Sequence, residues 1–185
     1  MIQSFFWMKR ISILLISLWI MALGTKAQSL QVGDRIPNFT LKDQQGEDFS
    51  ISSVLGKRIL VIYFYPKDDT PGCTKEACSF RDSYEAFTDE GAMVIGISAD
   101  DVETHRQFAE KYRLPFTLLA DTGNKVRKKF GVPGNLFGLI AGRVTYVVDN
   151  RGIIRHIYNS QVNASQHIDE SLEALRKVKK EDGNE

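Results

Sequence analysis

Histidine and cysteine are scarce in this sequence of 185 residues, and charge of one sign is not in excess. The three histidines, His105, His156 and His167, are scattered, and the two cysteines alone do not complete a four-ligand zinc site. The formal net charge is +1 with both signs dispersed, whereas a nucleic-acid-binding surface needs a basic stripe. We therefore expect no metal centre, no cofactor and no nucleic-acid partner.

Long hydrophobic runs are also few, and the longest lies near the N-terminus. Ile11–Leu23 is apolar except for two serines, follows the basic pair Lys9 and Arg10, and is shorter than the roughly 20 residues of a spanning helix. A small residue, Ala27, stands where a signal peptidase would cut. This pattern predicts a signal peptide over residues 1–27 and an exported protein, periplasmic or extracellular.

An uncleaved N-terminal anchor is the alternative, because Phe5–Met8 adds apolar residues ahead of the basic pair. Attachment to a membrane is then expected only through this segment. No cysteine lies near the cut, which excludes a lipid-modified cysteine at the new N-terminus. Residues 28–185 are expected to form one domain, and loss of Lys9, Arg10 and Lys26 takes its formal net charge to −2.

Strand and helix patterns alternate along this domain. Continuous β-branched and aromatic runs at Arg58–Tyr65 and Ala92–Ser98 predict two buried central strands. Hairpin signals occur between Asn38 and Ile51 and around Asn150–Gly152. Helices are expected over Pro71–Glu90, Asp101–Tyr112, Gly123–Phe130 and Ala164–Lys179, with a loop at Gly131–Gly142. The fold class is therefore α/β, a central mixed sheet flanked by helices, with an N-terminal β-hairpin.

The segment Pro66–Cys73 (PKDDTPGC) follows the first central strand, at the end where sites on α/β sheets tend to form. If Thr70 is the N-cap, Pro71 is the first helical residue and Cys73 the third. Free N–H groups and the helix dipole favour negative charge there, so a reactive thiolate is one interpretation of Cys73. An inert core cysteine is the other, because Cys73 continues a helical stripe of Ala77, Phe80, Tyr84 and Phe87.

The second cysteine, Cys78, lies off that stripe and is expected to be less buried. Two helical residues five positions apart have Cα atoms about 8.6 Å apart. A disulfide cannot close beyond about 7 Å without movement of the backbone. A bond between Cys73 and Cys78 therefore requires the helix to unwind, which suits a switch better than a structural crosslink.

The pattern Pro66-x-x-x-Thr70-x-x-Cys73 resembles the active-site signature of the peroxiredoxins. The spacing of Cys73 and Cys78 resembles the PrxQ (bacterioferritin comigratory protein) branch, and Arg143–Asp149 resembles the strand that supplies the family's arginine. The resemblance runs over nearly all of Val32–Lys177. It implies a thioredoxin-like fold for residues 28–185.

By this resemblance, Cys73 is the nucleophile that attacks a peroxide and Cys78 resolves the resulting sulfenic acid as a disulfide. Thr70, Arg143 and Pro66 complete the expected site. Glu76 has two equally good interpretations: it orients the arginine, or it lies on the outer surface of the helix. The three histidines are expected to be structural or solvated.

The implied activity is reduction of hydrogen peroxide or organic hydroperoxides by a monomer that a thioredoxin-like protein re-reduces. Two alternatives stay open. An exported thioredoxin-like thiol–disulfide oxidoreductase is weakened by the lack of a Cys-x-x-Cys motif. A redox sensor whose helix unwinding is read by a partner is the other.

Overall fold

The computed structural model describes residues 29–135 and 140–182. The predicted signal peptide or anchor lies outside these ranges. Within them, no helix is both long and apolar enough to cross a membrane. The strands are β1 (Thr40–Asp43), β2 (Asp48–Ser50), β3 (Ile59–Phe64), β4 (Ala92–Ser98), β5 (Thr117–Ala120), β6 (Gly134–Asn135), β7 (Ile140–Ala141), β8 (Val144–Val148) and β9 (Ile154–Asn159). The helices are η1 (Ile51–Ser53), α2 (Pro71–Asp82), α3 (Tyr84–Asp89), α4 (Val102–Tyr112), α5 (Lys125–Phe130) and α6 (Gln166–Asp182).

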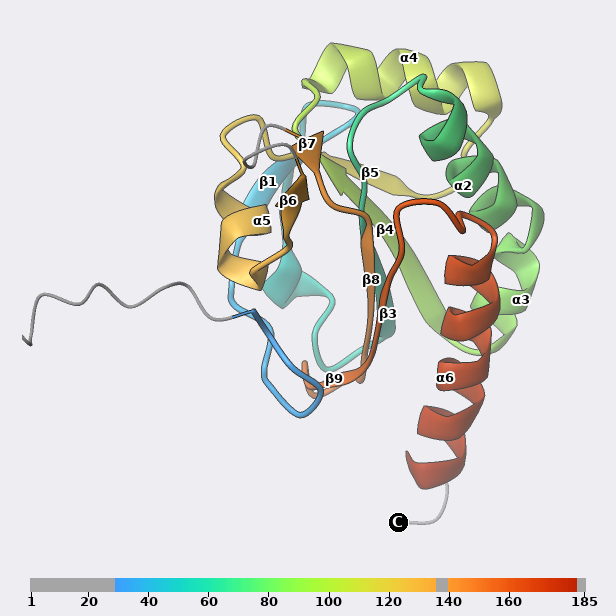
Figure 1. Cartoon of the computed structure of the whole chain (residues 1–185). Helices are drawn as coiled ribbons and strands as arrows, with labels where there is room; N and C mark the ends of the chain where they lie inside the picture. Colours follow the sequence, from blue (N-terminus) through green and yellow to red (C-terminus); the bar gives the residue numbers. More distant parts are fainter. Residues whose placement is uncertain (1–28, 136–139, 183–185) are drawn as a thin grey trace, which may run out of the picture.

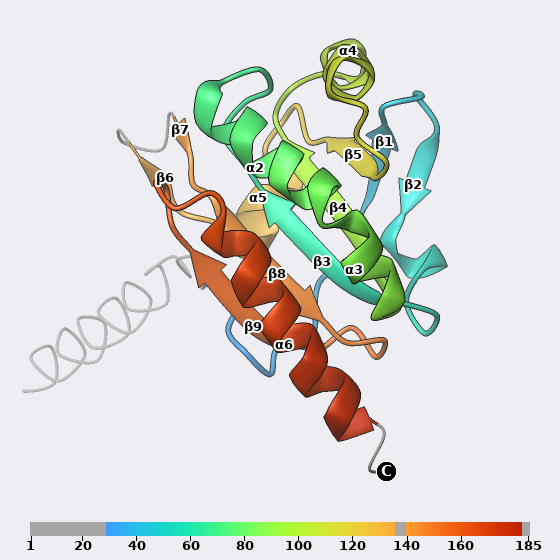
Figure 2. The ribbon, with the colours of Figure 1, turned by 90° about the vertical axis from the view of Figure 1, so that its right-hand side faces the viewer.

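Seven strands form one mixed sheet in the order β2-β1-β5-β4-β3-β8-β9. The central strands β3, β4 and β5 are parallel, whereas β8 runs antiparallel to β3 on the other side. Helices cover both faces, with α5 on one side and α2, α3 and α6 on the other (Figure 1). Figure 2 shows α3 continuing the line of α2, with α6 beside them on the same face of the sheet. This is the predicted α/β fold with a central mixed sheet, and β1 and β2 form the predicted N-terminal hairpin.

Side chains of β3 alternate between two cores, as the two-residue period of a strand requires. Val61 and Tyr63 pack under α2 and α6, and Leu60 and Ile62 pack on the face of α5. All four are at most 1% exposed. The run that was predicted to be a buried central strand is therefore buried on both faces.

Two predicted boundaries were wrong. The helix expected to continue to Glu90 is divided at Ser83, whose φ of −103° and ψ of 9° leave the helical region. Serine competes for backbone hydrogen bonds and so favours helix ends over helix interiors. The expected loop over 131–142 contains a short antiparallel pair, β6 and β7.

Candidate active site

Helix α2 begins immediately after the loop that leaves β3. Thr70 is the N-cap residue and Pro71 the first helical residue, as predicted, so that Cys73 lies in the first turn. The Cys73 side chain faces the core and is only 2% exposed. The predicted stripe is confirmed as well, because Ala77, Phe80 and Phe87 are buried with it in one cluster. Cys73 is therefore a core residue that lies at a helix N-terminus.

Arg143 reaches Cys73 from the neighbouring strand. It directly precedes β8, in which Val144 pairs with Phe64 and Thr145 pairs with Tyr63. Alternation along the strand directs Arg143 to the same face as Thr145, toward α2. Its Nη2 donates to Cys73 Sγ at 3.4 Å, and the side chain is 4% exposed. A buried guanidinium therefore contacts the sulfur directly.

Gly72 makes room for that guanidinium. A Cβ atom built on Gly72 would lie 3.2 Å from Arg143 Nη2, tighter than most real contacts of this kind. The absence of a side chain at this position therefore lets Arg143 approach the first turn of α2.

Glu76 is the second partner of Arg143. It is 0% exposed, and its Oε2 accepts a hydrogen bond from Arg143 Nη1. Burial raises the pKa of Glu76 from 4.5 to about 8, and the adjacent guanidinium opposes that rise only in part. The surface interpretation of Glu76 is wrong, because the side chain faces inward on the turn that follows Cys73.

His167, at the start of α6, extends this network in a way that the sequence did not indicate. Its Nε2–H donates to the carbonyl of Ser160 at 2.9 Å, so its Nδ1 accepts from the Thr145 hydroxyl at 2.7 Å. Nδ1 also lies 3.6 Å from Glu76 Oε1. Burial lowers the pKa of His167 from 6.5 to about 4, which keeps the ring neutral. The interpretation of His167 as a structural residue therefore misses its place beside Glu76.

The remaining motif residues lie around the entry to α2. The Thr70 hydroxyl donates to the carbonyl of Lys67 at 3.0 Å and makes no side-chain cap hydrogen bond to the helix. Pro66 lies two residues after the end of β3 and is half-buried. Both residues therefore belong to the loop that leads into α2, ahead of Cys73.

Cys78 is half-buried, as predicted, and both cysteines are free thiols. Helix α2 is continuous between them, so the two residues keep helical spacing. Arg81, one turn further, donates from Nε to Asp82 at 2.8 Å and from Nη1 to the carbonyl of Tyr112 at 2.8 Å. Cys78 is thus held beside an anchored cation.

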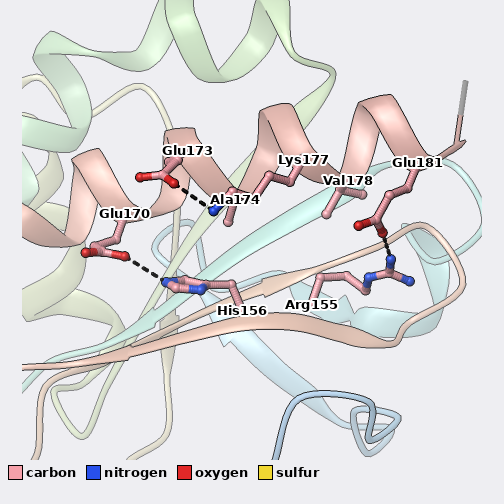
Figure 3. Close-up of a pocket in the computed structure, with 8 residues that line it drawn as sticks. All are labelled: Arg155, His156, Glu170, Glu173, Ala174, Lys177, Val178 and Glu181. Atoms are coloured by element: carbon pink, nitrogen blue, oxygen red, sulfur yellow. Dashed lines mark hydrogen bonds and ion pairs between the residues drawn. The ribbon is translucent and has the colours of Figure 1, made fainter.

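A separate hollow of about 100 Å³ lies between β9 and α6 (Figure 3). Its polar side chains pair with one another: His156 Nε2 lies 3.2 Å from Glu170, Lys177 lies 2.7 Å from Glu173, and Arg155 pairs with Glu181. None of these groups belongs to the Cys73 network. Across residues 29–135 and 140–182, no cluster of three or more histidine, cysteine or acidic side chains could hold a metal ion.

Comparison with known proteins assigns the family. The AhpC/TSA family matches residues 32–157. The chain is 57% identical over 146 residues to the chloroplastic peroxiredoxin Q of Populus jackii, a match that covers 79% of this chain and 68% of the relative. Among solved structures, peroxidoxin BcpB of Mycobacterium tuberculosis superposes with a TM-score of 0.76 at 36% identity, covering 80% of this chain and 98% of that one. Peroxiredoxin Q of Xanthomonas campestris gives a TM-score of 0.70 at 31% identity, covering 76% and 91%.

A thioredoxin-like α/β domain with a buried cysteine and guanidinium at the N-terminus of a helix is the architecture of a thiol peroxidase. The chain belongs to the AhpC/TSA family and, within it, to the peroxiredoxin Q branch. The resemblance stated from the motif is therefore confirmed, and with it the activity: this is a peroxiredoxin that reduces peroxides.

Proposed function

We propose that the chain reduces peroxides by a cycle in which Cys73 is oxidised and Cys78 resolves it. The observation that carries this assignment is the contact of Arg143 Nη2 with Cys73 Sγ, 3.4 Å apart and shielded from solvent. A guanidinium and the free N–H groups of a first helical turn together stabilise a thiolate at this sulfur. Glu76 holds the guanidinium in place through a second hydrogen bond.

In the first step, the Cys73 thiolate attacks the terminal oxygen of a peroxide ROOH. A sulfur–oxygen bond forms, the O–O bond breaks, and the leaving alkoxide or hydroxide takes up a proton as ROH or water. Arg143 stabilises the negative charge that moves from sulfur to oxygen, and donors placed in advance contribute about 100- to 1,000-fold in rate. Thr70 offers its hydroxyl oxygen to the incoming peroxide, and Pro66 shields the sulfur from water.

In the second step, the Cys78 thiolate attacks the Cys73 sulfenic acid and releases hydroxide, which leaves a disulfide. The two cysteines are separated by the intact helix α2, whose third and eighth residues they are. Closing the bond requires the first turns of α2 to unwind. Oxidised and reduced forms therefore differ in this segment.

A thioredoxin-like protein returns the enzyme to its reduced form by thiol–disulfide exchange. The functional unit is a monomer over residues 28–185, released from a signal peptide and exported to the periplasm or the cell exterior. The basic pair and 13-residue hydrophobic run of the N-terminal segment support that location. Intact mass of the secreted protein and its elution volume on gel filtration test the processing site and the oligomeric state.

Peroxide consumption by the parent chain, Cys73→Ser and Cys78→Ser, with thioredoxin and its reductase, tests the cycle. The parent should turn over with both hydrogen peroxide and an organic hydroperoxide, and Cys73→Ser should be inactive. Cys78→Ser should react once and then accumulate sulfenic or sulfinic acid, visible by intact mass. Continued peroxide consumption by Cys73→Ser would overturn the assignment, whereas insulin reduction without peroxide turnover would favour a disulfide oxidoreductase.

A further inference from the structure

The loop ahead of Cys73 is fastened to α4 by a buried network. Asp68 Oδ2 accepts from His105 Nδ1 at 2.7 Å, and Asp68 Oδ1 accepts from the Tyr65 hydroxyl at 2.7 Å. The side chains of His105 and Asp68 are 0% and 1% exposed. The backbone N–H of Asp68 donates to Asp100 at 2.9 Å, which ties the same residue to the end of β4. The hydrogen bonds of this network involve neither Cys73 nor Arg143.

Two further contacts join α4 to the cysteine segment from either side. Asp69, whose φ of 57° is unusual for a residue other than glycine, accepts from Lys111 Nζ at 2.7 Å and from the Tyr112 hydroxyl at 2.8 Å. Beyond Cys78, Arg81 Nη1 donates to the carbonyl of Tyr112. Helix α4 therefore holds the chain both before and after the span from Cys73 to Cys78 (Figure 1).

This arrangement opposes the unwinding that the disulfide needs. Cys73 follows Asp68 by five residues, so a fixed loop keeps the first turn of α2 seated on the core. A hydrogen bond to a charged group changes a conformational equilibrium by roughly 10- to 100-fold. The buried hydrogen bond between His105 and Asp68 is thus strong enough to control how often α2 opens.

We propose that His105 is a positioning residue that acts through Asp68. It holds the loop and the first turn of α2 in the folded state, and thereby sets how the Cys73 sulfenic acid divides between resolution by Cys78 and further oxidation. The inference rests on the proposed cysteine cycle, and it adds to that cycle the group that sets the opening of the helix.

The two fates of the sulfenic acid compete chemically. In resolution, the Cys78 thiolate forms a bond to Cys73 sulfur and hydroxide leaves. In overoxidation, the sulfenate attacks the terminal oxygen of a second peroxide, the O–O bond breaks, and sulfinate and ROH result. Resolution needs an open helix, whereas overoxidation proceeds in the closed one. A looser loop therefore favours the disulfide and slows the initial attack on peroxide.

His105→Leu tests this inference, because leucine fills the buried site and removes the donor. Reduced protein is mixed with increasing hydrogen peroxide, and disulfide and sulfinic acid are quantified by intact mass. The peroxide concentration that gives half sulfinic acid should rise about tenfold or more, and amide hydrogen exchange over residues 70–78 of the reduced protein should accelerate similarly. His105→Asn keeps a donor near the Nδ1 position and should restore behaviour close to the parent.

Tyr65→Phe removes only the other hydrogen bond to Asp68 and should shift both readouts severalfold in the same direction, which covers the case in which His105→Leu does not fold. Val178→Ala, at a buried position of α6, is the control for lost stability alone and should move neither readout. The role of His105 would be overturned if the parent is active but His105→Leu and Tyr65→Phe both leave two quantities unchanged. These are the division of Cys73 between disulfide and sulfinic acid and the amide hydrogen exchange over residues 70–78. A parent without peroxide turnover would overturn the proposed function instead, and the exchange measurement would still report whether His105 holds the loop.

Discussion

Arg143 and Glu76 form a buried hydrogen-bonded pair on the inner side of α2, with side chains 4% and 0% exposed. The same guanidinium donates to Cys73 Sγ through its other terminal nitrogen. One guanidinium therefore contacts both the Cys73 sulfur and the Glu76 carboxyl, so its position relative to the sulfur depends on Glu76.

Substitutions of Arg143 should separate the effect of its positive charge from the effect of its two simultaneous hydrogen bonds. Arg143→Lys keeps a cation that cannot bridge Glu76 and Cys73 together, so the rate of Cys73 oxidation should fall about 100-fold. Arg143→Ala leaves the buried Glu76 carboxyl without its hydrogen-bond donor and should cost about 1 to 3 kcal/mol of unfolding free energy.

The double variant Arg143→Met/Glu76→Gln should recover most of that stability while remaining slow with peroxide. Stopped-flow oxidation and urea unfolding measure the two properties. If Arg143→Lys is oxidised as fast as the parent, simultaneous contact with Glu76 and Cys73 is not needed for the rate.

Glu76 should make the folded state less stable as pH rises. Its pKa is raised by burial from 4.5 to about 8, so between these values the folded protein holds a proton that the unfolded chain releases. Stability contributed by the neutral carboxyl is complete below pH 4.5 and is lost as pH rises through 8.

Relative to Glu76→Gln, the parent should therefore lose on the order of 2 to 4 kcal/mol across this window. Urea unfolding of both proteins from pH 5 to 9 measures the difference. Parallel stability curves would show that the carboxylate is ionised throughout.

His167 should have the opposite effect on the acid side. Burial lowers its pKa from 6.5 to about 4, so the unfolded chain binds a proton in this range before the folded protein does. The stabilising effect of a neutral buried ring is complete above pH 6.5 and is lost as pH falls toward 4, on the order of 2 kcal/mol.

His167→Gln has no titrating ring and should lack this loss, which thermal or urea unfolding between pH 4 and 7 can measure. Comparison within the Glu76→Gln background separates the two groups, because their windows overlap. A slope shared by the parent and His167→Gln would assign the acid sensitivity to another group.

Gly96 in β4 should tolerate no side chain. A Cβ atom there would lie 2.7 Å from the ring of Tyr63 and 2.8 Å from Leu118, both fixed in the core. Gly96→Ala should therefore cost about 1 to 3 kcal/mol through overpacking. Gly123→Ala is the matched control, since its Cβ would contact only the flexible Lys125 side chain at 3.5 Å or more. Equal unfolding free energies for the two variants would contradict the steric argument.

The sequence predicted the parts of the fold and site that depend on local pattern. Capping residues and hydrophobic periodicity predicted the N-cap position of Thr70, the burial of β3 and the helix that carries both cysteines. The contact of Arg143 with Cys73 could be expected only through the family resemblance, because it depends on strand pairing between distant segments.

The contacts of His105 and His167 had no sequence signal. The sequence around a single histidine in a helix does not distinguish a side chain that faces solvent from one that contacts a buried acid. Their partners, Asp68 and Glu76, become neighbours only when α4 and α6 dock on the sheet. Likewise, the break at Ser83 interrupts a pattern that otherwise continues as one helix.

The register between β3 and β8 determines whether Arg143 lies on the same face of the sheet as Cys73. Phe64 faces Val144 and Tyr63 faces Thr145, which places Arg143 on the side of α2. A slip by one residue would turn every β8 side chain to the opposite face and carry the guanidinium away from the sulfur. A chain folded in that register would hide many of the same apolar residues yet be inert to peroxide. On the proposed cycle, the rate at which Cys73 reacts with added peroxide during refolding therefore reports the correct pairing of β3 with β8.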